Sequence, residues 1–304
     1  MGADHSHDAA GLVDHRGRLA TVLAITVTVL VVEVIGAIVS GSLALLADAA
    51  HMLTDVAGLT LGLLAAVLAR RPATPARTWG YRRAEVLGAA AQAALLLAVG
   101  AYVLVEGVRR LFEPPEVAST AMIVFGLVGL VGNLVGLAIL SSGRGDNLNM
   151  RAAFLEVVND ALGSVAVLVA ATIIATTGWL RADAVASLVI GVLIVPRTVR
   201  LLRETGHILL ESTPTGLNLQ LVRERLLSMD HVHEVHDVHA SQVATGLPVF
   251  TAHVVVDDSC FHDGHLAGML DQAQRCLADE FDVEHSTIQF EAASHAAHEP
   301  GTHA

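Results

Sequence analysis

The chain has 304 residues, of which 53% are hydrophobic and only 16% are charged, and its mean hydropathy is +0.59. A soluble domain usually carries about a quarter charged residues, so the composition argues against an ordinary soluble globular protein and indicates a membrane protein. The formal net charge of −12 comes with no basic patch, which argues against nucleic acid as a partner.

The first 18 residues form a polar arm that carries His5, His7 and His15. No cleavage motif follows a short apolar core, so we interpret the first apolar stretch as a retained membrane span rather than a signal peptide. The arm is therefore predicted to remain part of the protein.

Six apolar stretches between residues 19 and 205 are long enough to cross a hydrocarbon core of ~30 Å, which takes ~20 helical residues. Short joins that contain Gly, Pro or Ser separate them. The sequence thus predicts an all-α transmembrane domain of six helices, with both chain ends on the same side. The spans are Leu19–Val39, Leu43–Leu68, Ala84–Leu111, Thr120–Leu140, Ala152–Thr177 and Ala182–Leu202.

Arginine is distributed unequally between the two sides of the predicted bundle, and the chain has no lysine. One side has twelve arginines, whereas the opposite side has only Arg109, Arg110 and Arg181. Short cytoplasmic segments carry the excess of positive residues in membrane proteins, so we expect both termini to be cytoplasmic. The twelve are Arg16, Arg18, Arg70, Arg71, Arg77, Arg82, Arg83, Arg144, Arg151, Arg197, Arg200 and Arg203.

After about residue 206 the long apolar runs end, and a pattern of helix, strand, strand, helix and strand follows up to residue 292. This order predicts a small cytoplasmic α+β domain of the ferredoxin-like type. Residues 293–304 form a histidine-bearing tail that we expect to be disordered. The five elements are helix Leu217–Met229, strand Val232–Val243, strand Pro248–Asp257, helix His265–Phe281 and strand His285–Glu291.

Ionisable residues inside the predicted spans are the strongest functional signal. A charge there costs roughly 2.5–3.5 kcal/mol on insertion scales, so each needs a partner or a function. His51 and Asp55 are four residues apart in the second span, and Glu156 and Asp160 repeat this spacing in the fifth. Side chains at this spacing lie on one helix face, one turn apart. If the two spans are neighbours, the four groups close into one tetrahedral site.

One imidazole nitrogen and three carboxylate oxygens suit Zn²⁺, and suit Cd²⁺, Co²⁺ or Mn²⁺ less selectively. A single acid or histidine in a span often only bonds to a neighbouring helix, but two such pairs favour a metal site. Asp48, one turn earlier, fits a supporting position behind the ligands and a place on the entry path equally well. Glu33, Glu106 and Asn133 are expected to bond between helices or to line a water cavity.

The predicted site also implies a coupling mechanism. Metal ligands must be deprotonated, so a metal that binds to a buried acidic site releases protons from it. A site that opens alternately to the two sides would therefore exchange a divalent cation for protons. The sequence has no GxxxxGK[ST] motif, so nothing supports nucleotide-driven pumping.

Several motifs together resemble the cation diffusion facilitator family. The second span begins SGSLALLADAAHMLTD at residues 40–55, YRRAE at 81–85 precedes the third span, and FLEVVNDALGS at 154–164 lies in the fifth. PRT at 196–198, LLE at 209–211 and HDVH at 236–239 continue the match into the predicted soluble domain. The resemblance covers nearly the whole chain, in the order of the family.

The resemblance implies a homodimeric exporter of zinc in exchange for protons, located in a bacterial inner membrane, with no enzymatic activity and no resident cofactor. It implies a transport site at the positions of His51, Asp55, Glu156 and Asp160. Glu156 stands where many zinc-selective members have histidine, which is similar to the bacterial cobalt–zinc–cadmium resistance branch. Broad specificity, and a preference for Mn²⁺ or Fe²⁺, therefore stay open.

In the soluble domain, His236, His253 and His265 match positions where some members of the family bind regulatory zinc. The corresponding last-strand positions are Gln289 and Glu291 here, so a complete two-metal site is not expected. Whether this domain binds regulatory metal through His236, His253, His265 and Glu291, or only dimerises, stays open.

Two other functional classes are alternatives to an exporter. An intramembrane metalloenzyme is expected to carry HExxH or an equivalent motif and an open coordination position, and neither is predicted here. A membrane metal sensor without transport remains an alternative, and metal uptake into vesicles separates it from an exporter.

Overall fold

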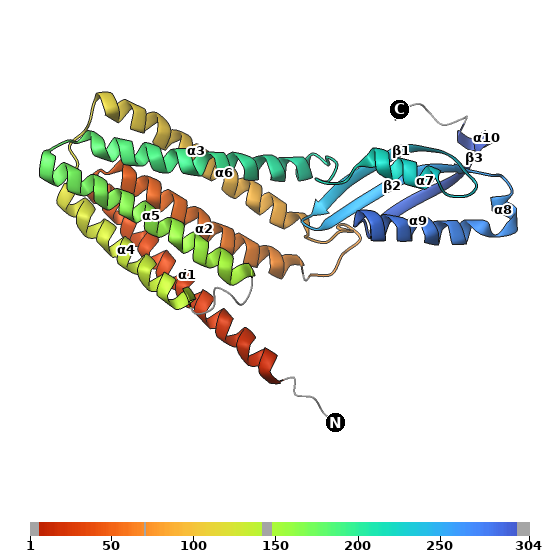
Figure 1. The fold of residues 1–304 in the computed structure, drawn as a ribbon, viewed down its shortest axis with the longest axis horizontal. Coiled ribbons are helices and arrows are strands. Elements are labelled where there is room, and N and C mark those ends of the chain that lie inside the picture. Colours follow the sequence, from red (N-terminus) through yellow and green to blue (C-terminus); the bar gives the residue numbers. More distant parts are fainter. Residues whose placement is uncertain (1–5, 70, 142–147, 297–304) are drawn as a thin grey trace. The chain divides into compact units, whose positions relative to one another are not determined.

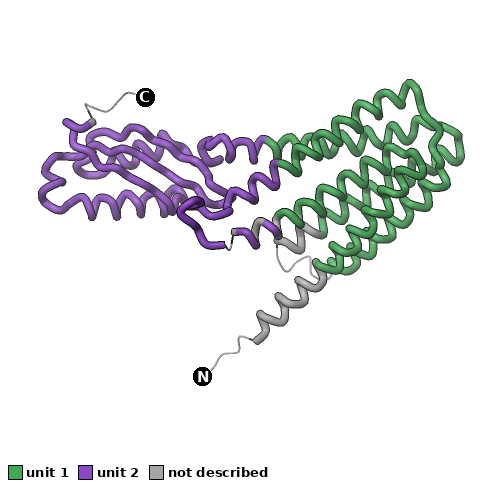
Figure 2. The backbone as a smooth tube through the Cα atoms, turned by 180° about the vertical axis from the view of Figure 1, so that it is seen from behind, with its two compact units in different colours: residues 1–63, 91–202 green, residues 64–90, 203–304 purple. Residues whose placement is uncertain are grey.

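The computed structural model describes residues 6–69, 71–141 and 148–296 (Figure 1). The chain divides into two compact units (Figure 2): residues 1–63 with 91–202, called unit 1, and residues 64–90 with 203–304, called unit 2. The side chains of residues 1–19 and 296–304 lie outside the described part, as do the predictions made for the histidines of the N-terminal arm and for most of the tail.

Unit 1 is built from long helices, as the apolar stretches predict. Five of the helices are long and apolar enough to cross a membrane over their described residues, and α2 has 27 residues, which is also the length of a span. Each predicted span overlaps one observed helix. The helices are α1 (Ser6–Ser40), α2 (Leu43–Ala69), α3 (Arg83–Phe112), α4 (Ser119–Ser141), α5 (Leu148–Thr177) and α6 (Arg181–Leu209).

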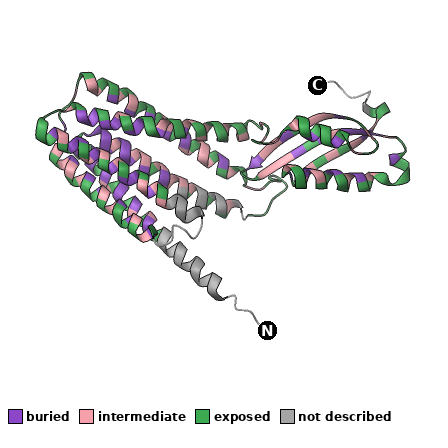
Figure 3. Cartoon of the chain, in the orientation of Figure 1, coloured by how far each residue is buried: buried purple, intermediate pink, exposed green. Residues whose placement is uncertain are grey.

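Small residues allow α4 to pack closely between α1 and α5. Its buried positions recur every three or four residues and include Gly126, Gly129 and Gly136. A Cβ added at Gly129 would overlap the carboxylate of Glu33 on α1, and one at Gly126 would touch Leu168 on α5. Buried and exposed residues alternate along the helices (Figure 3), and the exposed ones include many large apolar side chains, as expected of helices that face lipid.

A buried carboxylate fixes the start of α2. Asp183, at the beginning of α6, accepts hydrogen bonds from Ser42 Oγ (2.5 Å), from the Leu43 backbone N–H (2.8 Å) and from the Ala44 backbone N–H (3.1 Å). These backbone groups have no partner within the helix, and a negative charge at a helix N-terminus is favourable. Asp183 therefore ties the helix that carries His51 and Asp55 to α6.

Unit 2 contains a three-stranded sheet in the order β1-β2-β3. β1 and β2 pair antiparallel through a tight turn, whereas β2 and β3 pair parallel, so the chain crosses over through helix α9. The elements are α7 (Leu219–Leu227), β1 (Val232–Ala244), β2 (Leu247–Val256), α8 (Cys260–Asp263), α9 (His265–Phe281), β3 (His285–Ala292) and α10 (Ala293–Ala296).

The core of this domain lies between its helices and one face of the sheet. Leu226 of α7, Phe250 of β2 and Leu277 of α9 are all fully buried within it. The predicted helix–strand–strand–helix–strand order is confirmed, and α8 and α10 are single-turn additions that the periodicity did not predict. The fold class is thus a helical membrane domain followed by a small α+β domain.

Candidate metal sites

Three of the four predicted membrane ligands meet at one point in unit 1. His51 and Asp55 of α2 and Asp160 of α5 offer ligand atoms that all lie within 4.8 Å of one another. His51 Nε2 is 3.7 Å from Asp55 Oδ2 and 3.7 Å from Asp160 Oδ1. We call these three residues the transport-site group.

The carboxylates of the transport-site group are buried without enough hydrogen-bond donors. Asp55 is 9% exposed and Asp160 is 1% exposed. Asp55 Oδ2 and Asp160 Oδ1 accept no hydrogen bond from any described residue. Buried polar atoms are normally paired, so unpaired carboxylate oxygens beside an imidazole fit a position for a cation. One nitrogen and two oxygens at this spacing are donors that Zn²⁺ accepts.

Glu156 differs from the expectation, because it lies beside the transport-site group rather than within it. Its Oε1 atom is 3.7 Å from the Arg197 guanidinium of α6. The ion pair with Arg197 accounts for this placement. The structure therefore shows three gathered ligands and a fourth acid paired with an arginine.

Asp48 and Glu33 form a second buried acidic cluster in unit 1. The Ser164 Oγ atom lies 3.2 Å from Asp48 Oδ2 and 3.4 Å from Glu33 Oε1, and the Asn133 side-chain amide donates to Ser164 at 3.3 Å. Asp48 is thus buried, hydrogen-bonded to another helix and outside the three gathered ligands. Glu106 pairs with Arg110 at 3.1 Å on its own helix, so it is not a ligand either.

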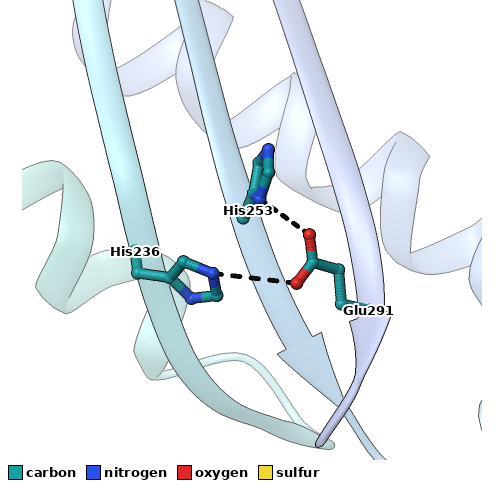
Figure 4. A group of neighbouring side chains, drawn as sticks. All are labelled: His236, His253 and Glu291. Carbon is teal, nitrogen blue, oxygen red and sulfur yellow. Dashed lines mark ion pairs between the residues drawn. The ribbon is translucent and has the colours of Figure 1, made fainter. Parts of the chain in front are cut away.

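A second group of ligand atoms lies on the sheet of unit 2 (Figure 4). His236 of β1, His253 of β2 and Glu291 of β3 offer atoms within 4.8 Å of one another, and we call them the sheet group. His253 Nδ1 is 2.7 Å from Glu291 Oε1, and His236 Nε2 is 3.7 Å from Glu291 Oε2. Two imidazoles and one buried carboxylate also form a donor set that suits Zn²⁺.

His265, which was expected to join the sheet group, lies elsewhere. It begins α9, where its Nδ1 atom is 2.8 Å from Asp263 Oδ2 and its ring stacks on His231 at 5.7 Å. The hydrogen bond from the His265 backbone N–H to Asp263 lowers the pKa of that carboxyl. These local contacts hold the side chain in the exposed α8–α9 segment. Gln289 instead donates to Glu291 at 2.7 Å and so supports the carboxylate.

An exposed cluster near His265 consists of Asp257, His231 and His233. Asp257 accepts hydrogen bonds from His233 (2.6 Å) and His231 (2.8 Å), and these two contacts lower the pKa of Asp257. The Asp257 and histidine side chains are all well exposed. Solvated ion pairing accounts for this cluster.

Comparison with known proteins decides the family. The model of the cation efflux transmembrane domain matches residues 19–210, and the model of the cation efflux protein cytoplasmic domain matches residues 214–293. The chain belongs to the cation efflux family. The metal cation efflux system protein CzcD of Cupriavidus metallidurans is 42% identical to it over 96% of this chain and 91% of that protein.

Other relatives of this cation efflux protein have names that include the metals zinc, cadmium and cobalt. The zinc transporter ZitB of Escherichia coli is 38% identical over 96% of this chain and 93% of that protein. The cadmium, cobalt and zinc/H(+)-K(+) antiporter of Bacillus subtilis is 34% identical over 88% of this chain and 86% of that protein. The solved metal-bound C-terminal domain of CzcD matches 25% of this chain and 99% of that structure, at 33% identity and a TM-score of 0.23.

The sequence pattern did not predict the roles of two residues in this cation efflux protein. The sequence places Arg197 only in a motif and in the arginine excess, although it pairs with a predicted ligand. Ser164 was not singled out, although it bridges the second acidic cluster. The signal for Ser164 was present, because Glu156, Asp160 and Ser164 recur every four residues on α5.

Proposed function

We propose that this cation efflux protein exports divalent transition-metal ions, Zn²⁺ first among them, from the cytoplasm in exchange for protons. The observation that carries the proposal is the transport-site group, because three metal-ligand atoms from two membrane helices lie within 4.8 Å of one another. The names of the relatives, which include a zinc transporter and a metal/proton antiporter, support both the cargo and the counter-ion.

The transport-site group explains how exchange would work. His51 Nε2 and the oxygens of Asp55 and Asp160 bind the metal only when they carry no proton, so metal and protons compete for the same atoms. When the site opens to the outside, protons replace the departing metal. Glu156 supplies a fourth oxygen once it leaves Arg197.

Selectivity follows from the same atoms. Carboxylate oxygens do not distinguish strongly among divalent ions, whereas imidazole and thiolate ligands do. A site with one imidazole and up to three carboxylates therefore fits Cd²⁺ and Co²⁺ besides Zn²⁺, and an exporter that prefers Mn²⁺ or Fe²⁺ is the alternative within the family.

For the remaining architecture, we infer a homodimer in a bacterial inner membrane, with residues 19–205 as the transport domain and residues 206–292 on the cytoplasmic side together with both termini. The excess of arginine on that side supports the orientation. The sheet group of His236, His253 and Glu291 would hold a regulatory metal ion there, since its donor atoms are already gathered.

Uptake of zinc into proteoliposomes that carry a pH gradient tests the proposal. The purified protein should accumulate zinc and release protons in the opposite direction, and Asp55→Ala and Asp160→Ala should abolish both fluxes. Glu106→Gln, a change in a membrane carboxylate that pairs with Arg110, is the matched control. Normal flux in both ligand variants would refute the site. Zinc binding without any flux in the unmodified protein would support the metal sensor instead.

A further inference from the structure

Arg197 is a cation that pairs with Glu156, the acid beside the transport-site group. Its guanidinium lies 3.7 Å from Glu156 Oε1. The Glu156 side chain is 28% exposed and the Arg197 side chain is 65% exposed. Both groups are thus accessible enough to separate.

The pairing coincides with the one departure of the site from its expected geometry. His51, Asp55 and Asp160 lie within ligand distance of one another, whereas Glu156, the acid that Arg197 contacts, is not part of that group. For Glu156 to supply a fourth ligand, its carboxylate must move into the group. Such a movement changes the 3.7 Å contact with Arg197, so arginine and metal can compete for this carboxylate.

The backbone beside Arg197 favours movement. Pro196 lies inside α6, directly before Arg197. Proline removes a backbone hydrogen bond of the helix and is the commonest cause of a kink. Arg197 is thus attached at the position where α6 bends most easily, so a small change in the bend shifts its guanidinium.

We propose that Arg197 is a tethered counter-ion, which occupies Glu156 while the site is empty and gives way to the metal when it binds. This inference rests on the proposed function. The ion pair places a positive charge beside one negative charge of the empty site. The presence of Arg197 also weakens metal binding, because the arginine must first be displaced.

Equilibrium zinc binding to the full-length protein in detergent tests the proposal. Binding is measured by competition with a chelating dye at about pH 8, where protons compete less for the ligands than at neutral pH. Arg197→Gln should lower the zinc Kd of the transport site about five- to tenfold, the effect of one ion pair worth about 1 kcal/mol. Binding by the Asp160→Asn variant gives the contribution of other sites. Arg200→Gln, one turn further along α6, is the matched control.

Two further variants separate the pairing from a structural effect. Arg197→Lys keeps the charge and should restore the original affinity. In the Glu156→Gln background, Arg197→Gln should change the zinc Kd by less than about twofold, because the competed carboxylate is gone. In proteoliposomes, Arg197→Gln should lower KM for zinc and also lower kcat, because the empty site returns more slowly.

An unchanged or weaker zinc affinity in Arg197→Gln would overturn the inference. An equal gain in the Glu156→Gln background would also overturn it, because the arginine would then act on the metal at a distance and not through Glu156. If the unmodified protein binds zinc but transports none, the proposed function fails, while the binding comparison still decides whether Arg197 competes for Glu156.

Discussion

The transport-site group and the sheet group use similar donors but hold their carboxylates differently. In the sheet group, Glu291 already accepts hydrogen bonds from His253 and Gln289, each at 2.7 Å. In the transport-site group, His51 is 3.7 Å from both acids, and one oxygen of each acid accepts no hydrogen bond from the described residues. Glu291 Oε2 also accepts no hydrogen bond from the described residues, so each group keeps an unpaired carboxylate oxygen. The difference is that the other Glu291 oxygen is already held by two donors on the sheet.

The supports of the two groups differ in the same sense. His236 and His253 are register partners on adjacent strands, and β3 is fixed beside them by a parallel ladder. Asp55 and Asp160 stand on two separate helices, whose side chains can change partners through small shifts between helices. This comparison indicates that the membrane group is suited to exchange and the sheet group to retention of a metal.

Loss of a membrane ligand should have the largest effect. Loss of a residue that only supports a metal ligand lowers metal affinity or activity by about 10–100-fold. Asp160→Asn removes a ligand itself, so it should reduce zinc flux in proteoliposomes by more than that. His253→Ala should reduce the same flux by less than about tenfold, because the sheet group does not carry the cargo. Equal losses in the two variants would remove the distinction between the groups.

Metal binding at the sheet group should change the stability of the protein rather than its zinc flux. In the Asp160→Asn background, zinc at about 100 times its Kd should stabilise the folded chain by about 2.7 kcal/mol through the sheet group. Glu291→Ala should abolish this gain, as seen in the thermal unfolding midpoint, whereas Ser286→Ala on the same strand should keep it. A zinc-dependent gain that persists in Glu291→Ala would exclude the sheet group as a metal site.

Packing around the membrane ligands should tolerate less change than the soluble domain. A Cβ at Gly163 of α5 would overlap the carboxylate of Asp48, so Gly163→Ala should destabilise the protein by about 1–3 kcal/mol. Gly268 of α9 has open space, so Gly268→Ala should stabilise it by up to about 1 kcal/mol. Thermal unfolding of the two variants measures the contrast, and changes of the same sign would contradict it.

The smallest effect concerns metal preference. Glu156→His replaces an oxygen ligand by an imidazole, which is also unable to pair with Arg197, so preference for Zn²⁺ over Cd²⁺ or Mn²⁺ should rise about tenfold. Competition between these metals during uptake measures it. An unchanged preference would show that Glu156 does not set the selectivity.

The long-range contacts mark the limit of what the sequence could predict. Helix length, apolar composition and the four-residue spacing of His51 and Asp55 were enough for the spans and for the site on α2. The partner of Glu156 was not predictable, because Arg197 lies 41 residues later and its direction depends on how α5 and α6 pack. His265 was misplaced for a related reason, since its neighbours Asp263 and His231 hold it more directly than the sheet does.

The carboxylate of Asp183 restricts which motions the bundle can use. It joins the first residues of α2 to the start of α6, so these two helix ends are held together. A bend at Pro196 would then move only the half of α6 that follows this residue. Arg197, which follows Pro196, would move with that half, whereas the start of α2 stays joined to the start of α6.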